Sequence, residues 1–82
     1  MAHQNTVQIK LSDIEKLDIK DLKQSKLDAI ENSCDSFETQ LNSRFNPIAL
    51  DMTSAPYKIF DGRHRIFLSR QKGYTSVPAV SI

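Results

Sequence analysis

The sequence predicts a small α+β domain with a mixed β-sheet and helices packed on it. Four short segments have the composition of strands, at residues 6–11, 47–52, 57–60 and 77–82. Between the first two of them, apolar residues recur at the spacing of a helix. A chain of 82 residues suffices for a single domain, which we place at 1–82, with a thin core between one sheet and one layer of helices.

The first segment alternates polar and apolar residues with a period of two, which predicts a half-buried strand. We expect its inner face to hold Val7, Ile9 and Leu11. Ser12 stands three residues before Glu15, which is the spacing of a capping box at a helix start. A short helical turn should follow, with Ile14 and Leu17 facing inward.

The clearest helical pattern is an apolar stripe with spacings of 3, 4, 3 and 4, made of Leu27, Ile30, Cys34, Phe37 and Leu41. On such a stripe Cys34 is expected to be an inert core residue. Ser25 is a candidate cap for the helix start, and Pro47 ends the helical segment. Three residues of this segment, Asn32, Ser33 and Ser36, are weak helix formers and indicate that the helix can break midway.

The second half of the chain predicts a hairpin, a helix and a closing strand. Strands at 47–52 and 57–60 are separated by a turn at 53–56 that contains a proline. A helix at 62–72 should end at Gly73, which suits the left-handed position after a helix. The segment 77–82 then supplies the last strand.

The amino-acid composition excludes some classes of protein. No apolar run approaches the roughly 20 residues that span a bilayer, so we expect no membrane association. One cysteine cannot form an intramolecular disulfide, which favours a cytoplasmic protein. Eleven basic and ten acidic residues give a net charge of +1, so any anion site must arise from local placement of charge. Four lysines alternate with acidic residues, as on a solvated helical face, at positions 16, 20, 23 and 26.

The most informative stretch is the turn that leads from the third strand into the last helix, Asp61, Gly62, Arg63, His64 and Arg65. A helix start has unpaired N–H groups and a partial positive charge. Gly62 lets the backbone approach a ligand, and an arginine can bind two phosphate oxygens at once. The pattern therefore predicts a phosphate-binding site formed by Gly62, Arg63, His64 and Arg65.

The same residues carry a family resemblance. Gly62-Arg63-His64-Arg65, followed by Gly73 and the apolar-Pro-apolar strand at 77–80, resembles the N-terminal domain of ParB proteins, which has Gly-Glu-Arg-Arg at this turn. Sulfiredoxins share that fold and have Gly-Cys-His-Arg there, so His64 and Arg65 match their last two positions. The resemblance covers residues 7–82 and implies a ParB/sulfiredoxin-like fold. It also implies a nucleotide or a nucleic acid as the ligand.

Arg63 departs from both families, since ParB proteins have glutamate there and sulfiredoxins have their reactive cysteine. We therefore do not expect sulfiredoxin activity. The expected function is binding of a nucleotide or nucleic-acid phosphate, with nuclease or phosphohydrolase activity in which His64 and Asp61 are the catalytic candidates. The alternative is a non-catalytic module that binds CTP, ATP or a protein partner. Simple turn chemistry also explains Asp61, and local capping or solvation also explains the basic residues.

A divalent metal with a nucleoside triphosphate is the cofactor that such an activity would use. The sequence does not supply an obvious metal site, because Asp51 and Asp61 are too few ligands and His3 stands close to the N-terminus. Arg70 and Lys72 follow Arg63 at near-helical spacing and would extend a basic strip along the last helix.

Overall fold

The sheet and its topology agree with the predicted fold class. A computed structural model describes residues 5–82 of the chain, in which four strands form one mixed sheet of order β1-β4-β2-β3. The strands are β1 (Val7–Lys10), β2 (Ile48–Asp51), β3 (Lys58–Asp61) and β4 (Ser76–Ser81). β2 and β4 run parallel, whereas β1 with β4 and the predicted hairpin of β2 with β3 are antiparallel.

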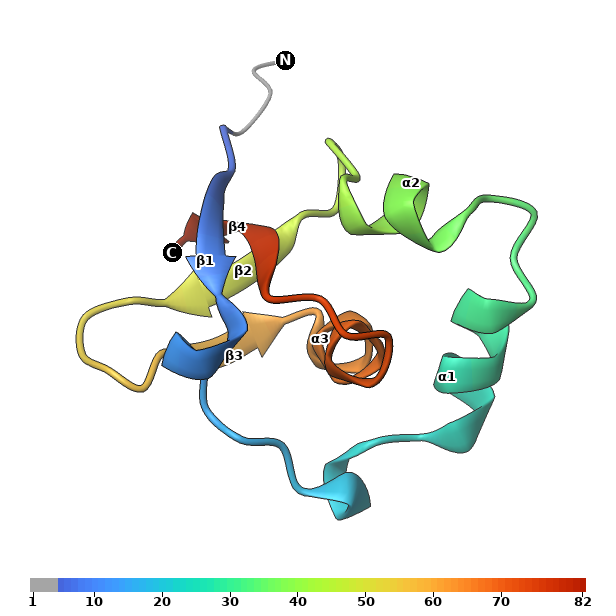
Figure 1. Cartoon of the computed structure of the whole chain (residues 1–82), viewed down its shortest axis with the longest axis horizontal. Coiled ribbons are helices and arrows are strands. Elements are labelled where there is room, and N and C mark those ends of the chain that lie inside the picture. Colours follow the sequence, from blue (N-terminus) through green and yellow to red (C-terminus); the bar gives the residue numbers. More distant parts are fainter. Residues whose placement is uncertain (1–4) are drawn as a thin grey trace.

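The helices are α1 (Gln24–Glu31), α2 (Phe37–Leu41) and α3 (Arg63–Gln71), with 3₁₀ turns at η1 (Leu11–Asp13) and η2 (Ile19–Asp21). Figure 1 shows α3 end-on between the sheet and α1, while α1 and α2 form an arm that curves around it. We call α1, α2 and the segments that join them to η2 and β2 the α1–α2 arm. None of the helices in residues 5–82 combines the length and the apolar character that crossing a bilayer requires.

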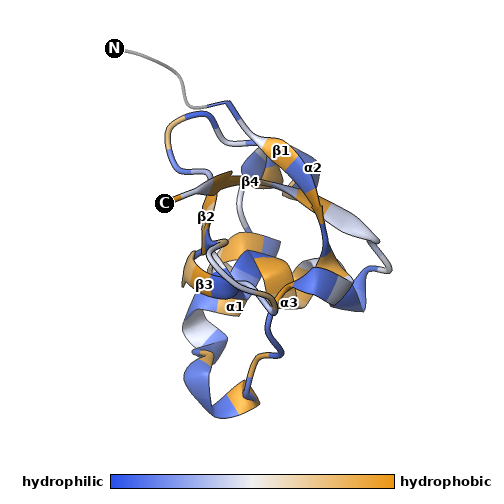
Figure 2. Ribbon diagram, turned by 90° about the vertical axis from the view of Figure 1, so that its left-hand side faces the viewer, coloured by the Kyte–Doolittle hydropathy of each residue, from blue (hydrophilic) through white to orange (hydrophobic). Residues whose placement is uncertain are grey.

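The core lies between the sheet and α3. Ile48 and Leu50 of β2, Ile66 of α3 and Val77 of β4 have no exposed surface. Figure 2 shows apolar stretches of β2 and α3 beside one another. Ser69 is equally buried, and its hydroxyl donates a hydrogen bond to the Arg65 carbonyl at 2.8 Å, so its polar atom is satisfied within the helix. The core thus fixes α3 on the sheet.

The predicted apolar stripe is divided between two helices. The break at residues 32–36 occurs where weak helix formers indicated it, and Gln40 Nε2 donates to the carbonyls of Ile30 and Asp35 there, at 3.0 and 3.1 Å. Cys34 lies in the break and is exposed, so its assignment to the core is wrong. Spacings of 3 and 4 place residues on one face only while the helix is continuous. Ser25 lies inside α1 rather than capping it.

The start of the chain also differs from the prediction. Val7, on the edge strand β1, is 56% exposed, and Leu11 is buried but belongs to η1. No capping box forms at residue 12. Instead, the Glu15 carboxylate accepts a hydrogen bond from the Ile59 N–H at 2.7 Å and covers part of the outer edge of β3. Ile14 is buried and Leu17 is partly buried, as predicted.

The predicted basic strip on α3 does not form. The Arg70 guanidinium donates to three backbone carbonyls of the segment after β1, those of Leu11, Ile14 and Glu15, at 3.0, 3.0 and 3.1 Å. Lys72 pairs with Glu31 at 3.2 Å, and its ammonium lies 5.0 Å from the centre of the Phe37 ring. Both cations therefore hold the fold together instead of extending the surface of Arg63.

Candidate functional site

A cleft of about 880 Å³ opens between the start of α3 and the α1–α2 arm. All five residues of the predicted turn line it, namely Asp61, Gly62, Arg63, His64 and Arg65. Gly62 has a φ of 103°, and a Cβ on it would lie 2.8 Å from Ile48 Cγ1. Only glycine therefore turns the chain from β3 into α3 at this distance from the core.

No acidic side chain lies in the first turn of α3, and Asp61 stands directly before its N-cap. The N-cap, Gly62, has no side chain to accept a hydrogen bond. The first intrahelical bond runs from the Ile66 N–H to the Gly62 carbonyl at 3.0 Å. In this part of the described chain, the positive end of the helix dipole thus has no compensating carboxylate cap.

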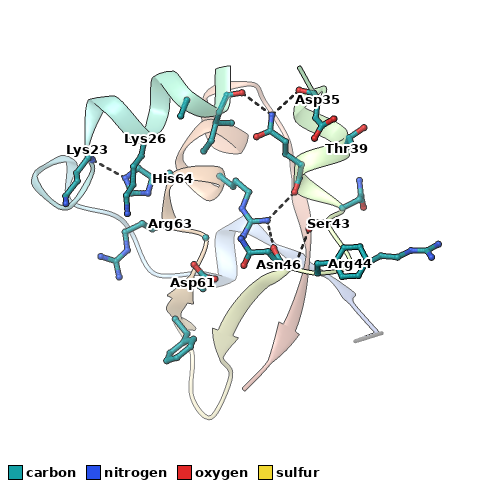
Figure 3. Close-up of a pocket in the computed structure, with 18 of the residues that line it drawn as sticks. Lys23, Lys26, Asp35, Thr39, Ser43, Arg44, Asn46, Asp61, Arg63 and His64 are labelled. Carbon is teal, nitrogen blue, oxygen red and sulfur yellow. Dashed lines mark hydrogen bonds between the residues drawn. The ribbon is translucent and has the colours of Figure 1, made fainter. Parts of the chain in front are cut away.

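Three basic side chains gather around His64. Lys23 and Lys26 come from the start of α1, and Arg63 comes from the start of α3; Figure 3 shows them on the same side of the cleft. We call these three residues the cationic cluster. Partial burial, together with the charges of Lys26, Arg63 and Lys23, lowers the pKa of His64 below its ordinary value of 6.5. Among residues 5–82, no carboxylate forms an ion pair with the cluster.

His64 also connects the two walls of the cleft. Its Nε2 accepts a hydrogen bond from the backbone N–H of Lys23 at 3.0 Å, across 41 positions of sequence. An Nε2 that accepts a hydrogen bond is unprotonated, so the neutral ring carries its proton on Nδ1. The lowered pKa agrees with this neutral form at pH 7. Proton transfer by His64 would therefore use Nδ1, or would require the bond to Lys23 to open.

Arg65 is buried and bound to backbone carbonyls. Its side chain is 8% exposed, and Nη1 donates to the carbonyls of Asn46 at 2.8 Å and Gln40 at 3.2 Å. Burial lowers the pKa of the guanidinium, and the charge of Asp61 partly offsets this effect. Arg65 thus fixes the chain after α2 against α3 and forms part of the cleft wall, a structural role that the sequence pattern did not predict.

The structure adds residues that the sequence did not place in the site. Lys23 and Lys26 were assigned to a solvated face because acidic residues alternate with them, but the fold brings both to the cleft. Arg44, Phe45 and Phe60 also line it. For Phe60 the sequence did contain a signal, because this residue stands directly before the predicted turn.

Metal ligands do not converge in the described part of the chain. Within residues 5–82, no group of three or more His, Cys, Asp or Glu side chains is placed to hold a metal ion. Asp51 accepts hydrogen bonds from the hydroxyl and the N–H of Thr53, which lower its pKa, and it serves the turn after β2. His3 lies outside the described residues. Residues 5–82 thus contribute no cluster of metal ligands to the cleft.

The chain matches no protein-family model, no curated protein and no solved structure. The resemblance to ParB and sulfiredoxin domains therefore stays a prediction. What the site can do follows from its own geometry: it places positive charge and an uncapped helix start on a cleft, where an anion would be stabilised.

Proposed function

We propose that the cleft binds a phosphate group of a nucleotide or a nucleic acid, in a small domain of the ParB/sulfiredoxin-like type. The cationic cluster at the uncapped start of α3 carries this proposal. Lys23, Lys26 and Arg63 each act on His64, and none of them forms an ion pair within residues 5–82, so their positive charge beside the cleft is uncompensated. A phosphate would compensate that charge and accept charge-assisted hydrogen bonds.

Binding without catalysis fits the geometry best. The Nε2 atom of His64 is already bonded to Lys23, and the pKa of the imidazole lies below its ordinary value. A nuclease or phosphohydrolase is the second candidate, because His64 and Asp61 line the same cleft and Nδ1 has no hydrogen-bond partner among the described residues. In that case His64 would move the proton and Asp61 would orient the reacting groups.

Titration with inorganic pyrophosphate, ATP and CTP, followed by calorimetry, tests the binding proposal. Replacing Arg63 with alanine removes charge-assisted bonds worth about 1.5–3 kcal/mol, so affinity should fall roughly tenfold to a hundredfold. Lys58→Ala is the matched control, because Lys58 is an exposed cation on β3 that does not line the cleft. Equal losses in both variants, or no binding by the parent, would remove the phosphate site from this turn.

Hydrolysis assays separate the two candidates. If His64 transfers a proton, His64→Gln should keep nucleotide binding within several-fold while turnover falls by about a hundredfold or more. A parent protein that binds nucleotides or oligonucleotides but hydrolyses none of them, with or without Mg²⁺, is a binding module.

We also propose a cytoplasmic location. The single cysteine is exposed and unpaired, a state that a reducing compartment preserves. Fractionation of cells that produce the protein, with detection by an antibody, tests this proposal directly. Recovery from a membrane or an extracellular fraction would contradict it.

A further inference from the structure

The geometry points to single-stranded nucleic acid as the occupant of the cleft, with bases stacked on exposed phenylalanine rings and phosphates near the cationic cluster. This inference rests on the proposed phosphate-binding function and specifies its ligand. The feature that carries it is a pair of exposed aromatic side chains. Phe45 is 86% exposed and Phe60 is 68% exposed, and both line the cleft.

Exposure of these two rings contrasts with that of the other two phenylalanines. The other phenylalanines, Phe37 and Phe67, are partly buried. One exposed apolar side chain is ordinary in a folded protein, whereas here two exposed phenylalanines line the same cleft as the cationic cluster. Proteins that bind single strands combine these same elements, a positively charged groove and aromatic faces on which bases stack.

Strand geometry explains how Phe60 becomes available. Neighbouring side chains in a strand point to opposite faces of the sheet, so buried Ile59 enters the core while Phe60 faces outward. Phe60 therefore does little for the core, and its removal should leave the domain folded.

Charge at the cleft favours an extended anion. Apart from Arg65, which binds backbone carbonyls, four basic side chains and three carboxylates line it, and three of these four form the cationic cluster. Figure 3 shows Arg44 on the side of the cleft opposite to the cationic cluster, with its side chain directed outward. Basic groups on two sides suit successive phosphates of one strand better than a single phosphate.

A single strand also suits the rings better than a duplex does. In a duplex both faces of an interior base are covered by its neighbours, so exposed phenylalanines have no free base to contact. In a single strand the bases are available for stacking. The inference therefore requires that bases, and not charge alone, contribute to affinity.

Fluorescence anisotropy with labelled oligonucleotides tests this requirement. The probes are oligo(dT), oligo(rU), an abasic strand of equal length and a duplex, with pyrophosphate titrated separately. The parent should bind the two base-containing strands more tightly than the abasic strand and the duplex. Phe60→Ala should weaken oligo(dT) binding by about fivefold or more and leave pyrophosphate binding unchanged. Val7→Ala, an exposed apolar residue on β1, is the control.

Salt dependence tests the phosphate contacts independently. Arg63→Ala and Lys26→Ala should each reduce the slope of log K against log salt by about 0.7 for a single strand, while Lys58→Ala leaves it unchanged. Thermal melts establish that each variant is folded. If Phe60→Ala does not fold, Phe45→Ala takes its place with the same expectation.

The possible results separate this inference from the function on which it rests. If pyrophosphate or a nucleotide binds but single, abasic and duplex strands bind alike, or Phe60→Ala has no effect, the single-strand assignment is wrong and the phosphate site stands. If neither pyrophosphate nor any oligonucleotide binds, both are wrong. Tight binding of a mononucleotide with no gain from a longer strand also overturns the single-strand assignment.

Discussion

The two sides of the cleft bury different amounts of apolar side chain. On one side, the sheet and α3 supply the largest side chains with almost no exposure, including Ile48, Leu50, Ile66 and Val77. On the other, α1 and α2 each bury a single residue, Leu27 and Leu41. Since buried apolar surface is the main stabilising term in folding, the sheet and α3 should form the more stable part of the molecule.

The α1–α2 arm is attached through both apolar and polar contacts. Leu41 of α2 belongs to the same core cluster as Ile48 and Ile66, and Phe37 packs against that cluster. The polar contacts run to α3 and its C-terminal end. Arg65 binds carbonyls after and within α2, His64 accepts from the N–H of Lys23, and Lys72 pairs with Glu31. Lys23 and Lys26 of the cationic cluster belong to the arm. The proposed ligand site therefore depends for its shape on these polar contacts as well as on the apolar core that Leu41 joins.

The largest expected effect comes from truncating the core. Ile66→Ala should lower the free energy of unfolding by about 2–5 kcal/mol, because Ile66 is fully buried between α3 and the sheet. The arm counterpart is Ile30→Ala, whose side chain is only partly buried and should lose much less. Urea titration of both variants measures the difference. Equal losses would show that the arm is as much a part of the core as α3.

Arg65→Ala should give the next largest effect. The substitution leaves the carbonyls of Gln40 and Asn46 without their donor, which should cost about 1.5–3 kcal/mol in the free energy of unfolding. Arg44→Ala, an exposed arginine of the same cleft, should change stability by less than about 0.5 kcal/mol. Chemical denaturation measures both. A neutral Arg65→Ala would mean that the arm is held without this guanidinium.

The sequence predicts the sheet and α3 better than the arm, and the reason is physical. The strands and the start of α3 have local sequence signals. These are the alternation of polar and apolar residues, the glycine at the helix start and the prolines at turns. Whether Cys34 is buried depended instead on whether one helix continued through residues 32–36. The role of Arg65 depended on carbonyls 19 and 25 positions away. The same guanidinium chemistry that binds phosphate also binds carbonyl oxygens, so the residue type alone did not distinguish the two roles.

The lysines of the site were missed for a related reason. Alternation of Lys23 and Lys26 with acidic residues describes the local surface of a segment, and it does not show which element that surface faces. Only the contact between the start of α1 and the start of α3 places both lysines around His64. The turn at residues 61–65 could be predicted, by contrast, because the strand before it and the helix after it both have local sequence signals.

Stability should depend on pH through His64. Since its pKa in the folded protein lies below the ordinary 6.5, the unfolded chain binds more protons between the two values. This contribution to stability is therefore present above about pH 6.5 and is lost as the pH falls through the folded-state pKa. His64→Gln should flatten that part of the profile. Asp51, whose pKa is lowered from 3.8, acts only at more acidic pH.

Urea midpoints of the parent and of His64→Gln between pH 5 and pH 8 measure this dependence. A proton resonance of the imidazole also follows the titration, with a His3→Gln variant to assign it. Bound pyrophosphate should raise the pKa of His64, because an anion favours the protonated ring. An unchanged pKa with ligand bound would place the anion away from the cationic cluster.

The smallest effect is expected at Cys34, in the break between α1 and α2. An exposed side chain without packing partners contributes little, so Cys34→Ser should change the free energy of unfolding by less than about 0.5 kcal/mol. The thiol of the native protein should also react with a disulfide reagent at a rate close to that of the urea-unfolded chain. A buried cysteine would instead react only after opening, and its replacement by serine would destabilise the domain. A slow reaction together with a large loss of stability would indicate that Cys34 is buried on one continuous helix. The arm would then bury more apolar surface, and the contrast between the two sides of the cleft would not hold.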